Sequence, residues 1–354
     1  MTSMAVTPTG AKPRLLEVHN VVHEFHVHGA GGVRSGTVHA VSDVSFHLDA
    51  GETLGVVGET GSGKSTLARC VLQIPRPKSG SVRLKGTELV GLRGGRLQRA
   101  RRDMQMVFQD PFGSLNPTWR ITDIVEEPMI GFGVGDSSRR RQRVRELLDV
   151  VGLNPNVYGG RRPRQLSGGQ AQRVAIARAI ALNPALVVCD EPVSSLDVLI
   201  QAQVLNLLET LRTDLGLSYL FISHDLALVK QVSDRVAVMH LGQLCEVGPA
   251  EEMYRAPRHP YTVQLLASIP SLDPTKPRAN ARALAGGEPP SPLNPPSGCR
   301  YRTRCPRAQQ LCADERPLLR ELTPGHEVAC HFPEPVDPPN GAVATPAAAT
   351  AQHA

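Results

Sequence analysis

Residues 58–66 (GETGSGKST) combine glycines, a lysine and hydroxyl side chains at the spacing G-x-x-x-x-G-K-[ST]. An apolar run at 53–57 precedes them and a stretch with helical spacing at 67–72 follows, which is the strand–loop–helix context of a phosphate-binding loop. Glycine lets successive backbone N–H groups turn toward one anion, and the helix N-terminus adds a partial positive charge. The alternative interpretation is an ordinary glycine-rich turn.

The side chains of this loop predict how a nucleotide and its metal ion would be held. Lys64 supplies a positive charge for the β- and γ-phosphates, and the Ser65 hydroxyl is a ligand for Mg²⁺. The other loop residues that we expect to bind the nucleotide are Gly58, Thr60, Gly61, Ser62, Gly63 and Thr66.

Four polar side chains follow apolar strands elsewhere in the chain. Asp190 and Glu191 end the strand at 186–189, where Asp190 can enter the Mg²⁺ shell and Glu191 can accept a proton from an attacking water. Gln109 can bind the metal or orient water, and the His224 imidazole can hydrogen-bond the γ-phosphate. The two acids and His224 also have plainer interpretations: solvated acids at a turn, and a structural histidine.

A second element suited to phosphate stands at 166–170 (LSGGQ). Ser167 is a plausible helix N-cap, and Gly168 and Gly169 expose N–H donors ahead of Gln170. One nucleotide rarely needs two such elements from the same chain.

Four of the seven cysteines lie close together in a short segment rich in Arg and Pro: Cys299, Cys305, Cys312 and Cys330. Disulfides are disfavoured in a reducing cytosol, whereas four thiolates suit a zinc ion or an iron–sulfur cluster. Because no C-x-x-C is present, unlinked thiols remain an alternative. Cys70, Cys189 and Cys245 fall in core elements, and we interpret them as buried apolar residues.

The elements that must position these residues alternate between strands and helices. Strands at 81–84, 104–108, 186–189 and 218–223 and helices at 168–182, 200–215 and 226–231 predict an α/β fold with a parallel sheet. Two strands between 14 and 48 predict an antiparallel β subdomain, and 236–246 predicts a closing hairpin. Helical patterns at 121–130 and 138–151 predict a helical insertion spanning about 110–165.

Composition shifts mark the domain boundaries. We expect a disordered lead at 1–13, a nucleotide-binding domain at 14–250, and a small cysteine-containing C-terminal extension at 251–332. The extension contains a Pro-rich linker at 270–298, and a disordered tail follows at 333–354.

The composition is that of a globular protein: among 354 residues, 41% are hydrophobic and 20% charged. No apolar run reaches the ~18 residues of a membrane span, so we expect the chain to stay in the cytosol and to meet a membrane only through a partner. The net charge of +6 comes mostly from Arg clusters at 99–102, 139–145 and 161–164. Interspersed acids favour solvated helix faces over a nucleic-acid surface.

Taken together and in order, these motifs resemble those of the nucleotide-binding subunit of an ATP-binding-cassette (ABC) transporter, from residue 14 to about 333. The resemblance implies a P-loop NTPase core of the ABC ATPase type and an MgATP substrate. It implies that two subunits pair head to tail, so that each ATP lies between one phosphate loop and the other subunit's signature motif at 166–170. Phe25 matches the aromatic residue that stacks on adenine, and Asp197 belongs to the SSLD motif at 194–197.

Within the ABC family, the sequence is similar to the F-type ATPase of dipeptide/oligopeptide importers at 107–117, 190–194 and 259–262. That branch implies a peptide importer at the cytoplasmic face of the cell membrane. Its parts are a D-type ATPase partner, two permeases and an extracytoplasmic peptide-binding protein, with no nucleic acid. It also implies that the four late cysteines bind a [4Fe–4S] cluster, with zinc as the alternative. Nickel, glutathione or an antimicrobial peptide are alternative cargoes, and a soluble ABC ATPase acting on nucleic acid or ribosomes is a further alternative.

Three positions depart from the family pattern: Gln165, Ala171 and Ser195 stand where Glu, Arg and Ala are usual. None of these changes removes a catalytic group, so we expect an active site. Ala171 alters the contacts expected around the helix that follows the signature motif.

Overall fold

The computed structural model describes residues 13–28, 34–269 and 290–335. The predicted lead at 1–13, the tail at 333–354 and the linker at 270–298 therefore lie mostly outside the described residues. Within the described part, no helix has the length and apolar character needed to cross a membrane.

The core is an eight-stranded sheet in the order β11-β12-β10-β9-β3-β8-β7-β6. The five strands from β9 to β6 run parallel, and β10, β12 and β11 continue the sheet antiparallel. The strands are β3 Thr53–Val57, β6 Met104–Val107, β7 Leu186–Asp190, β8 Ser218–Ile222, β9 Arg235–His240, β10 Gln243–Pro249, β11 Arg320–Thr323 and β12 His326–Val328. The predicted parallel sheet and closing hairpin are confirmed.

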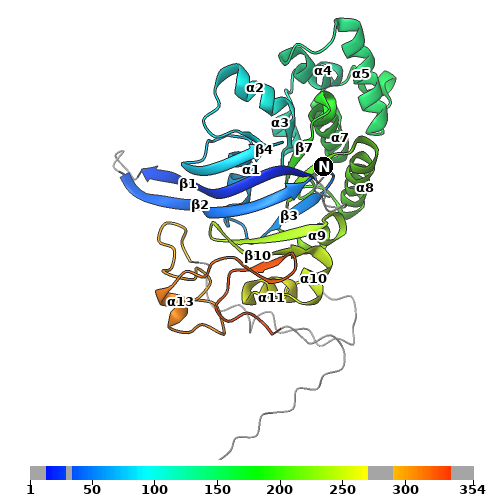
Figure 1. The fold of residues 1–354 in the computed structure, drawn as a ribbon. Coiled ribbons are helices and arrows are strands. Elements are labelled where there is room, and N and C mark those ends of the chain that lie inside the picture. The colour runs from blue at the N-terminus through cyan, green and yellow to red at the C-terminus, as the bar shows by residue number, and fades with distance from the viewer. Residues whose placement is uncertain (1–12, 29–33, 270–289, 336–354) are drawn as a thin grey trace, which may run out of the picture.

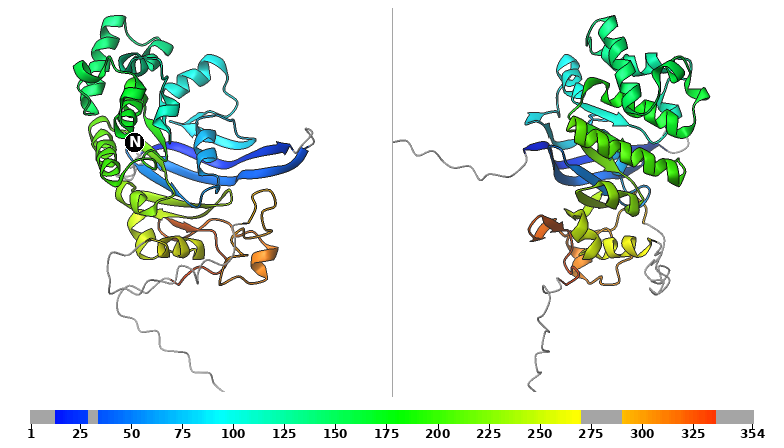
Figure 2. Two further views of the ribbon diagram at one scale, coloured as in Figure 1. Left: turned by 180° about the vertical axis from the view of Figure 1, so that it is seen from behind. Right: turned by 90° about the vertical axis from the view of Figure 1, so that its right-hand side faces the viewer.

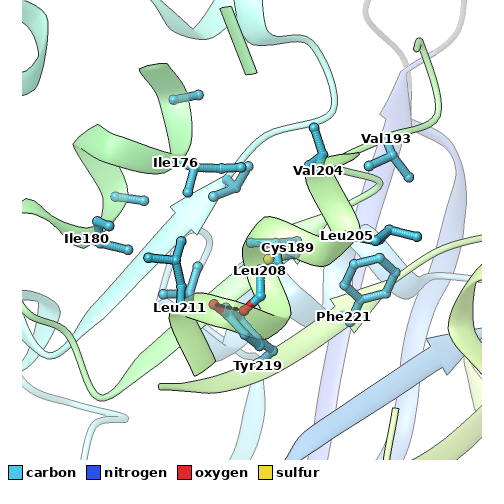
Figure 3. Packing of buried hydrophobic residues seen from close by; sticks show 14 of the residues in the cluster. Ile176, Ile180, Cys189, Val193, Val204, Leu205, Leu208, Leu211, Tyr219 and Phe221 are labelled. Atoms are coloured by element: carbon cyan, nitrogen blue, oxygen red, sulfur yellow. Dashed lines mark hydrogen bonds between the residues drawn. The ribbon is translucent and has the colours of Figure 1, made fainter. Parts of the chain in front are cut away.

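Alternate residues of the central strands enter two different apolar cores, as the two-residue period of a strand requires. In β8, Tyr219 and Phe221 face the core beneath the helices, whereas Leu220 and Ile222 face the core beneath the antiparallel sheet. The helices of the first core include α7 Gly168–Ala179, which ends in a 3₁₀ turn at Ile180–Leu182, α8 Val198–Leu215 and α9 Leu226–Val232. Figure 3 shows this packing, in which the Tyr219 hydroxyl donates to the Leu208 carbonyl over 3.0 Å.

The opposite face of the sheet is covered by α1 Lys64–Val71 and by the predicted antiparallel subdomain. That subdomain is a four-stranded sheet of order β2-β1-β4-β5. Its strands are β1 Arg14–His28, β2 Arg34–Asp49, β4 Ser79–Leu84 and β5 Thr87–Glu88. Figure 2 shows the antiparallel strands and α8 on opposite sides of the central sheet, which makes a three-layered core.

Helices extend one end of the molecule, as the insertion at about 110–165 predicts (Figure 1). They are α3 Pro111–Ser114, α4 Ile121–Gly131, α5 Ser137–Val150, α6 Pro155–Tyr158 and a 3₁₀ turn at Pro163–Gln165. A further helix, α2 Gly94–Arg102, was not part of the sequence prediction; only Leu97 of it is buried, so its apolar periodicity is weak.

The C-terminal extension lies at the opposite end of the molecule from these helices (Figures 1 and 2). It comprises α10 Ala250–Arg255, α11 Pro260–Ala267, α13 Leu311–Asp314 and the strands β11 and β12. Its strand β12 pairs with β10, joining Glu246 to Val328. The extension therefore continues the core sheet rather than standing apart from it.

Candidate functional site

The phosphate loop joins the buried strand β3 to helix α1. Lys64, the first residue of α1, is buried, and its Nζ donates to the carbonyls of Gly58 (2.7 Å) and Glu59 (2.9 Å). Burial lowers the pKa of Lys64, while the carboxylates of Glu191, Asp190 and Glu59 act in the opposite direction. A buried cation surrounded by a curled backbone is a site that favours an anion.

Two positions of the loop require glycine because backbone carbonyl oxygens approach them closely. A methyl group on Gly58 would lie 2.0 Å from the Met239 carbonyl oxygen, and one on Gly63 would lie 2.0 Å from that of Ala40. Both residues also have positive φ, 153° and 104°. By contrast, a methyl on Gly61 would meet no atom within 4 Å, so the backbone there faces open space, as a phosphate cradle must.

Ser65 and Asp190 meet beside the loop. The Ser65 hydroxyl donates to Asp190 Oδ1 over 2.6 Å, and Arg69 lies 3.7 Å from Oδ2. Burial raises the pKa of the Asp190 carboxyl, and the Ser65 hydrogen bond and the Arg69 charge oppose that rise. The pair offers two adjacent oxygen ligands, which is the donor chemistry that Mg²⁺ takes together with phosphate oxygens and water.

Glu191 lies at the centre of a second group of hydrogen-bonded side chains. Its Oε2 accepts from Gln109 Nε2 over 3.0 Å, and its Oε1 is 3.1 Å from His224 Nδ1. The backbone of Glu191 has φ 50°, and its N–H donates to the Ile222 carbonyl over 2.9 Å, which fixes the chain where β7 ends. Gln109, Glu191 and His224 follow three neighbouring parallel strands, so the carboxyl edge of the sheet brings them together.

The signature motif is built as a helix cap. Ser167 and Gln170 form a capping box at the start of α7: Gln170 N donates to Ser167 Oγ (3.3 Å) and Ser167 N to Gln170 Oε1 (3.0 Å). Gly169 packs so closely on Ile200 that a methyl group would lie 2.4 Å from its Cγ2, while Gly168 faces Leu196. Within the described residues, no hydrogen bond joins 167–170 to the phosphate loop of the same chain.

Two further predicted binding residues make contacts of their own. Asp197 caps α8, accepting from Ile200 N over 3.1 Å. Phe25 is half-exposed on β1, with its ring edge-on to His23 at 4.7 Å between centroids.

Three residues of the site were not foreseen. Glu59, within the phosphate loop, is bound by Arg304 of the extension, and its backbone N–H donates to the Tyr261 hydroxyl. Nothing in the sequence pattern pairs residues separated by 245 positions.

The four late cysteines gather around one cavity, together with His259, Tyr301 and Phe332. They are free thiols, and burial raises the pKa of Cys299, Cys305 and Cys330, the last to about 12. The cavity has a volume of about 10 Å³, room for one water molecule at most. Among the described residues, no group of three or more His, Cys, Asp or Glu side chains is arranged to hold a metal ion. The donor chemistry therefore suits a metal, but the spacing of the side chains does not.

Known families match both parts of the chain. Residues 41–194 match the ABC transporter family, and residues 245–312 match the family described as the oligopeptide/dipeptide transporter C-terminal region. The fold agrees: the chain is similar to the dimeric ATP-binding cassette MJ0796 bound to ADP and Pi, at a TM-score of 0.60 and 28% identity, over 67% of this chain and 99% of that one. The cbiO1 cassette from Clostridium perfringens gives the same TM-score at 25% identity, over 69% of this chain and 92% of that one.

Similar sequences extend over almost the whole chain. The putative oligopeptide transport ATP-binding protein YkfD of Bacillus subtilis is 48% identical, over 90% of this chain and 95% of its own length. The oligopeptide transport ATP-binding protein AppF of the same organism is 46% identical, over 90% and 97%. The chain therefore belongs to the ABC transporter ATP-binding proteins of the oligopeptide/dipeptide family. It is the ATP-binding subunit, and so the ATPase, of a peptide transport system of this family.

Proposed function

We propose that the phosphate loop and the group around Glu191 form one MgATP hydrolysis site. Lys64 and the loop N–H groups bind the β- and γ-phosphates, and Ser65, Asp190 and Gln109 hold the Mg²⁺. The single observation that carries the proposal is that Glu191 is held by both Gln109 and His224 at the same sheet edge as the Ser65–Asp190 pair. Mg²⁺, when bound, neutralises charge on the phosphate oxygens.

In this site each side chain has a separate task. Glu191 orients the attacking water and accepts its proton at a carboxylate oxygen, because it is the largely buried acid at the strand end beside the loop. His224 hydrogen-bonds the γ-phosphate, and Gln109 links the metal to Glu191. Phe25 stacks on the adenine.

The signature motif works in a dimer. Since Ser167, Gly168, Gly169 and Gln170 do not meet the phosphate loop of their own chain, we assign them and Asp197 to the nucleotide bound by a second ABC subunit. The second subunit is a D-type ATPase in a heterodimer. ATP then holds the two subunits together, and hydrolysis separates them.

The assembly that these steps drive is an importer of di- and oligopeptides at the cytoplasmic face of the cell membrane. It contains two permeases and an extracytoplasmic peptide-binding protein, and no nucleic acid. A groove of about 880 Å³ between the core and the helical insertion, lined by Phe108, Asp110 and Ser114, supports docking of a permease segment there. Nickel, glutathione or an antimicrobial peptide remain alternative cargoes, because the ATPase does not touch the cargo.

Purification of the full chain from native membranes in mild detergent, with mass spectrometry of the bound proteins, tests this assembly. Two permeases and a second ABC ATPase are the expected partners. Binding of radiolabelled di- and oligopeptides to the co-purified binding protein then tests the cargo. Recovery with ribosomes or nucleic acid alone would refute the importer and favour a soluble ABC ATPase.

We further propose that Cys299, Cys305, Cys312 and Cys330 bind a [4Fe–4S] cluster, with zinc as the alternative. The support is the residue type and the common cavity, and binding requires the four side chains to be rearranged from their described positions. Iron, sulfide and zinc analysis of anaerobically purified protein decides the matter: four irons with matching sulfide support the cluster, and the absence of all three refutes any metal.

A further inference from the structure

The phosphate loop carries an acidic residue that a distant part of the chain neutralises. The Glu59 carboxylate accepts two hydrogen bonds from Arg304, Nη1 to Oε2 and Nη2 to Oε1, each 2.9 Å long. The Arg304 side chain is 6% exposed and that of Glu59 29%. A parallel, two-bond guanidinium–carboxylate pair of this kind is stronger and more directional than a single ion contact, above all when it is largely removed from water.

The backbone of the same residue is held as well. The Glu59 N–H donates to the Tyr261 hydroxyl over 3.0 Å. Tyr261 is fully buried, and its ring packs on His240 (4.5 Å between centroids) and on Tyr301 (5.2 Å). The hydroxyl is thus fixed by rigid aromatic packing rather than by a flexible side chain.

The charge on Glu59 matters because the loop has to attract an anion. An acidic side chain within a triphosphate site repels the ligand, and pairing it with a cation removes that repulsion. The Glu59 carbonyl also accepts from Lys64 Nζ, so the position of Glu59 bears directly on the lysine that binds phosphate.

Both groups that hold Glu59, the Arg304 guanidinium and the Tyr261 hydroxyl, come from the extension. Tyr261 lies in α11, and Arg304 directly precedes Cys305 in the loop that begins at Cys299. We propose that the extension acts as a clamp on the phosphate loop: Arg304 neutralises the Glu59 carboxylate, Tyr261 fixes the Glu59 backbone, and together they set the affinity of the loop for MgATP. The inference rests on the proposed MgATP site. It links nucleotide binding to the order of the cysteine segment, whatever that segment binds.

Binding of a fluorescent ATP analogue with Mg²⁺ to the full chain tests the clamp. Arg304→Gln leaves the Glu59 carboxylate unpaired. We therefore expect the Kd of this variant for the ATP analogue to rise about tenfold, as loss of a charge-assisted hydrogen bond predicts. Arg304→Lys should lie between Arg304→Gln and the wild type. The double variant Glu59→Gln/Arg304→Gln should bind within about twofold of the wild type, because the repelling charge is gone and Tyr261 still holds the backbone N–H of residue 59.

The matched control is Arg316→Gln, which removes another ion pair between the extension and the core, that with Asp43 at 2.9 Å. It should leave the Kd unchanged. A Kd for Arg304→Gln equal to that of Arg316→Gln would overturn the clamp, as would a double variant that binds as weakly as Arg304→Gln.

Two further measurements distinguish failure of the clamp from misfolding of Arg304→Gln and from failure of the proposed MgATP site. Glu59→Gln alone needs no change in the extension, so it should bind MgATP at least as tightly as the wild type even if Arg304→Gln fails to fold; weaker binding would overturn the charge argument. If the wild type itself binds no MgATP, the proposed site fails, and with it the basis of the clamp.

Discussion

Replacing Glu191 by Gln removes its charge while keeping its contacts. The glutamine oxygen can still accept from Gln109 Nε2, and its NH₂ can donate to the Nδ1 of a His224 tautomer that is unprotonated there, so both contacts of about 3 Å survive. What is lost is the proton acceptor. Since a positioned general base contributes about 10²–10⁴-fold, we expect kcat to fall by about that factor, equivalent to roughly 3–5 kcal/mol of the barrier.

The assay is single-turnover phosphate release from MgATP by the full chain co-purified with the second ABC ATPase, measured together with nucleotide affinity. Affinity should stay within about twofold of the wild type, because the phosphate loop and the Ser65–Asp190 pair are untouched. Glu191→Ala, which deletes both side-chain contacts, should lose the same turnover and also loosen Gln109 and His224. Hydrolysis by Glu191→Gln within a few-fold of the wild type would refute Glu191 as the base.

Three other changes test separate features of the structure. Gly63→Ala should weaken MgATP binding more than tenfold and more than Gly61→Ala, because only the methyl at Gly63 meets a carbonyl, at 2.0 Å; equal losses would point to backbone strain alone. Burial lowers the pKa of His240 to about 4 from its usual 6.5, so the unfolded chain binds the extra proton between those values. His240 should therefore contribute about 1.4 kcal/mol per pH unit to the fall in unfolding free energy between pH 6.5 and about 4. The buried His259 contributes in the same direction, so His240→Asn should reduce the slope in urea titrations by that amount and not abolish it. Deletion of 251–354 should cost at least about 3 kcal/mol or abolish soluble expression, since the buried Glu246 loses its partners; a truncated chain with wild-type urea stability would contradict this.

The sequence alone allowed most of the core to be predicted, because local patterns determine it. Apolar runs of four to six residues that end in Gln109, Asp190 or His224 are typical of parallel strands, and their carboxyl ends have to meet. Helix α2 was missed because its exposed Arg-rich face hides any apolar period. The strands β11 and β12 were missed because they are four and three residues long and become strands only through pairing, β12 with β10 and β11 with β12.

The catalytic group was likewise predictable in its residues but not in its contacts. Residue types and strand ends indicated Glu191, Gln109 and His224, whereas the positive φ of Glu191 and its two hydrogen bonds depend on three strands being adjacent. The cysteine segment shows the opposite case. Residue types indicated a metal site, but the described side chains leave a cavity of only about 10 Å³ between them.

The extension is held to the core by buried polar groups, and separating them would cost a large free energy. Glu246 of β10 is fully buried, and its carboxylate accepts from the backbone N–H groups of Arg258 (2.7 Å) and His259 (2.9 Å) and lies 2.7 Å from His326 Nε2. A buried carboxylate that loses such partners costs far more than a lost surface contact. These bonds hold the start of α11 and strand β12 against the sheet. That anchoring is what allows Tyr261, two residues beyond His259, to hold the phosphate loop in a fixed position rather than follow it.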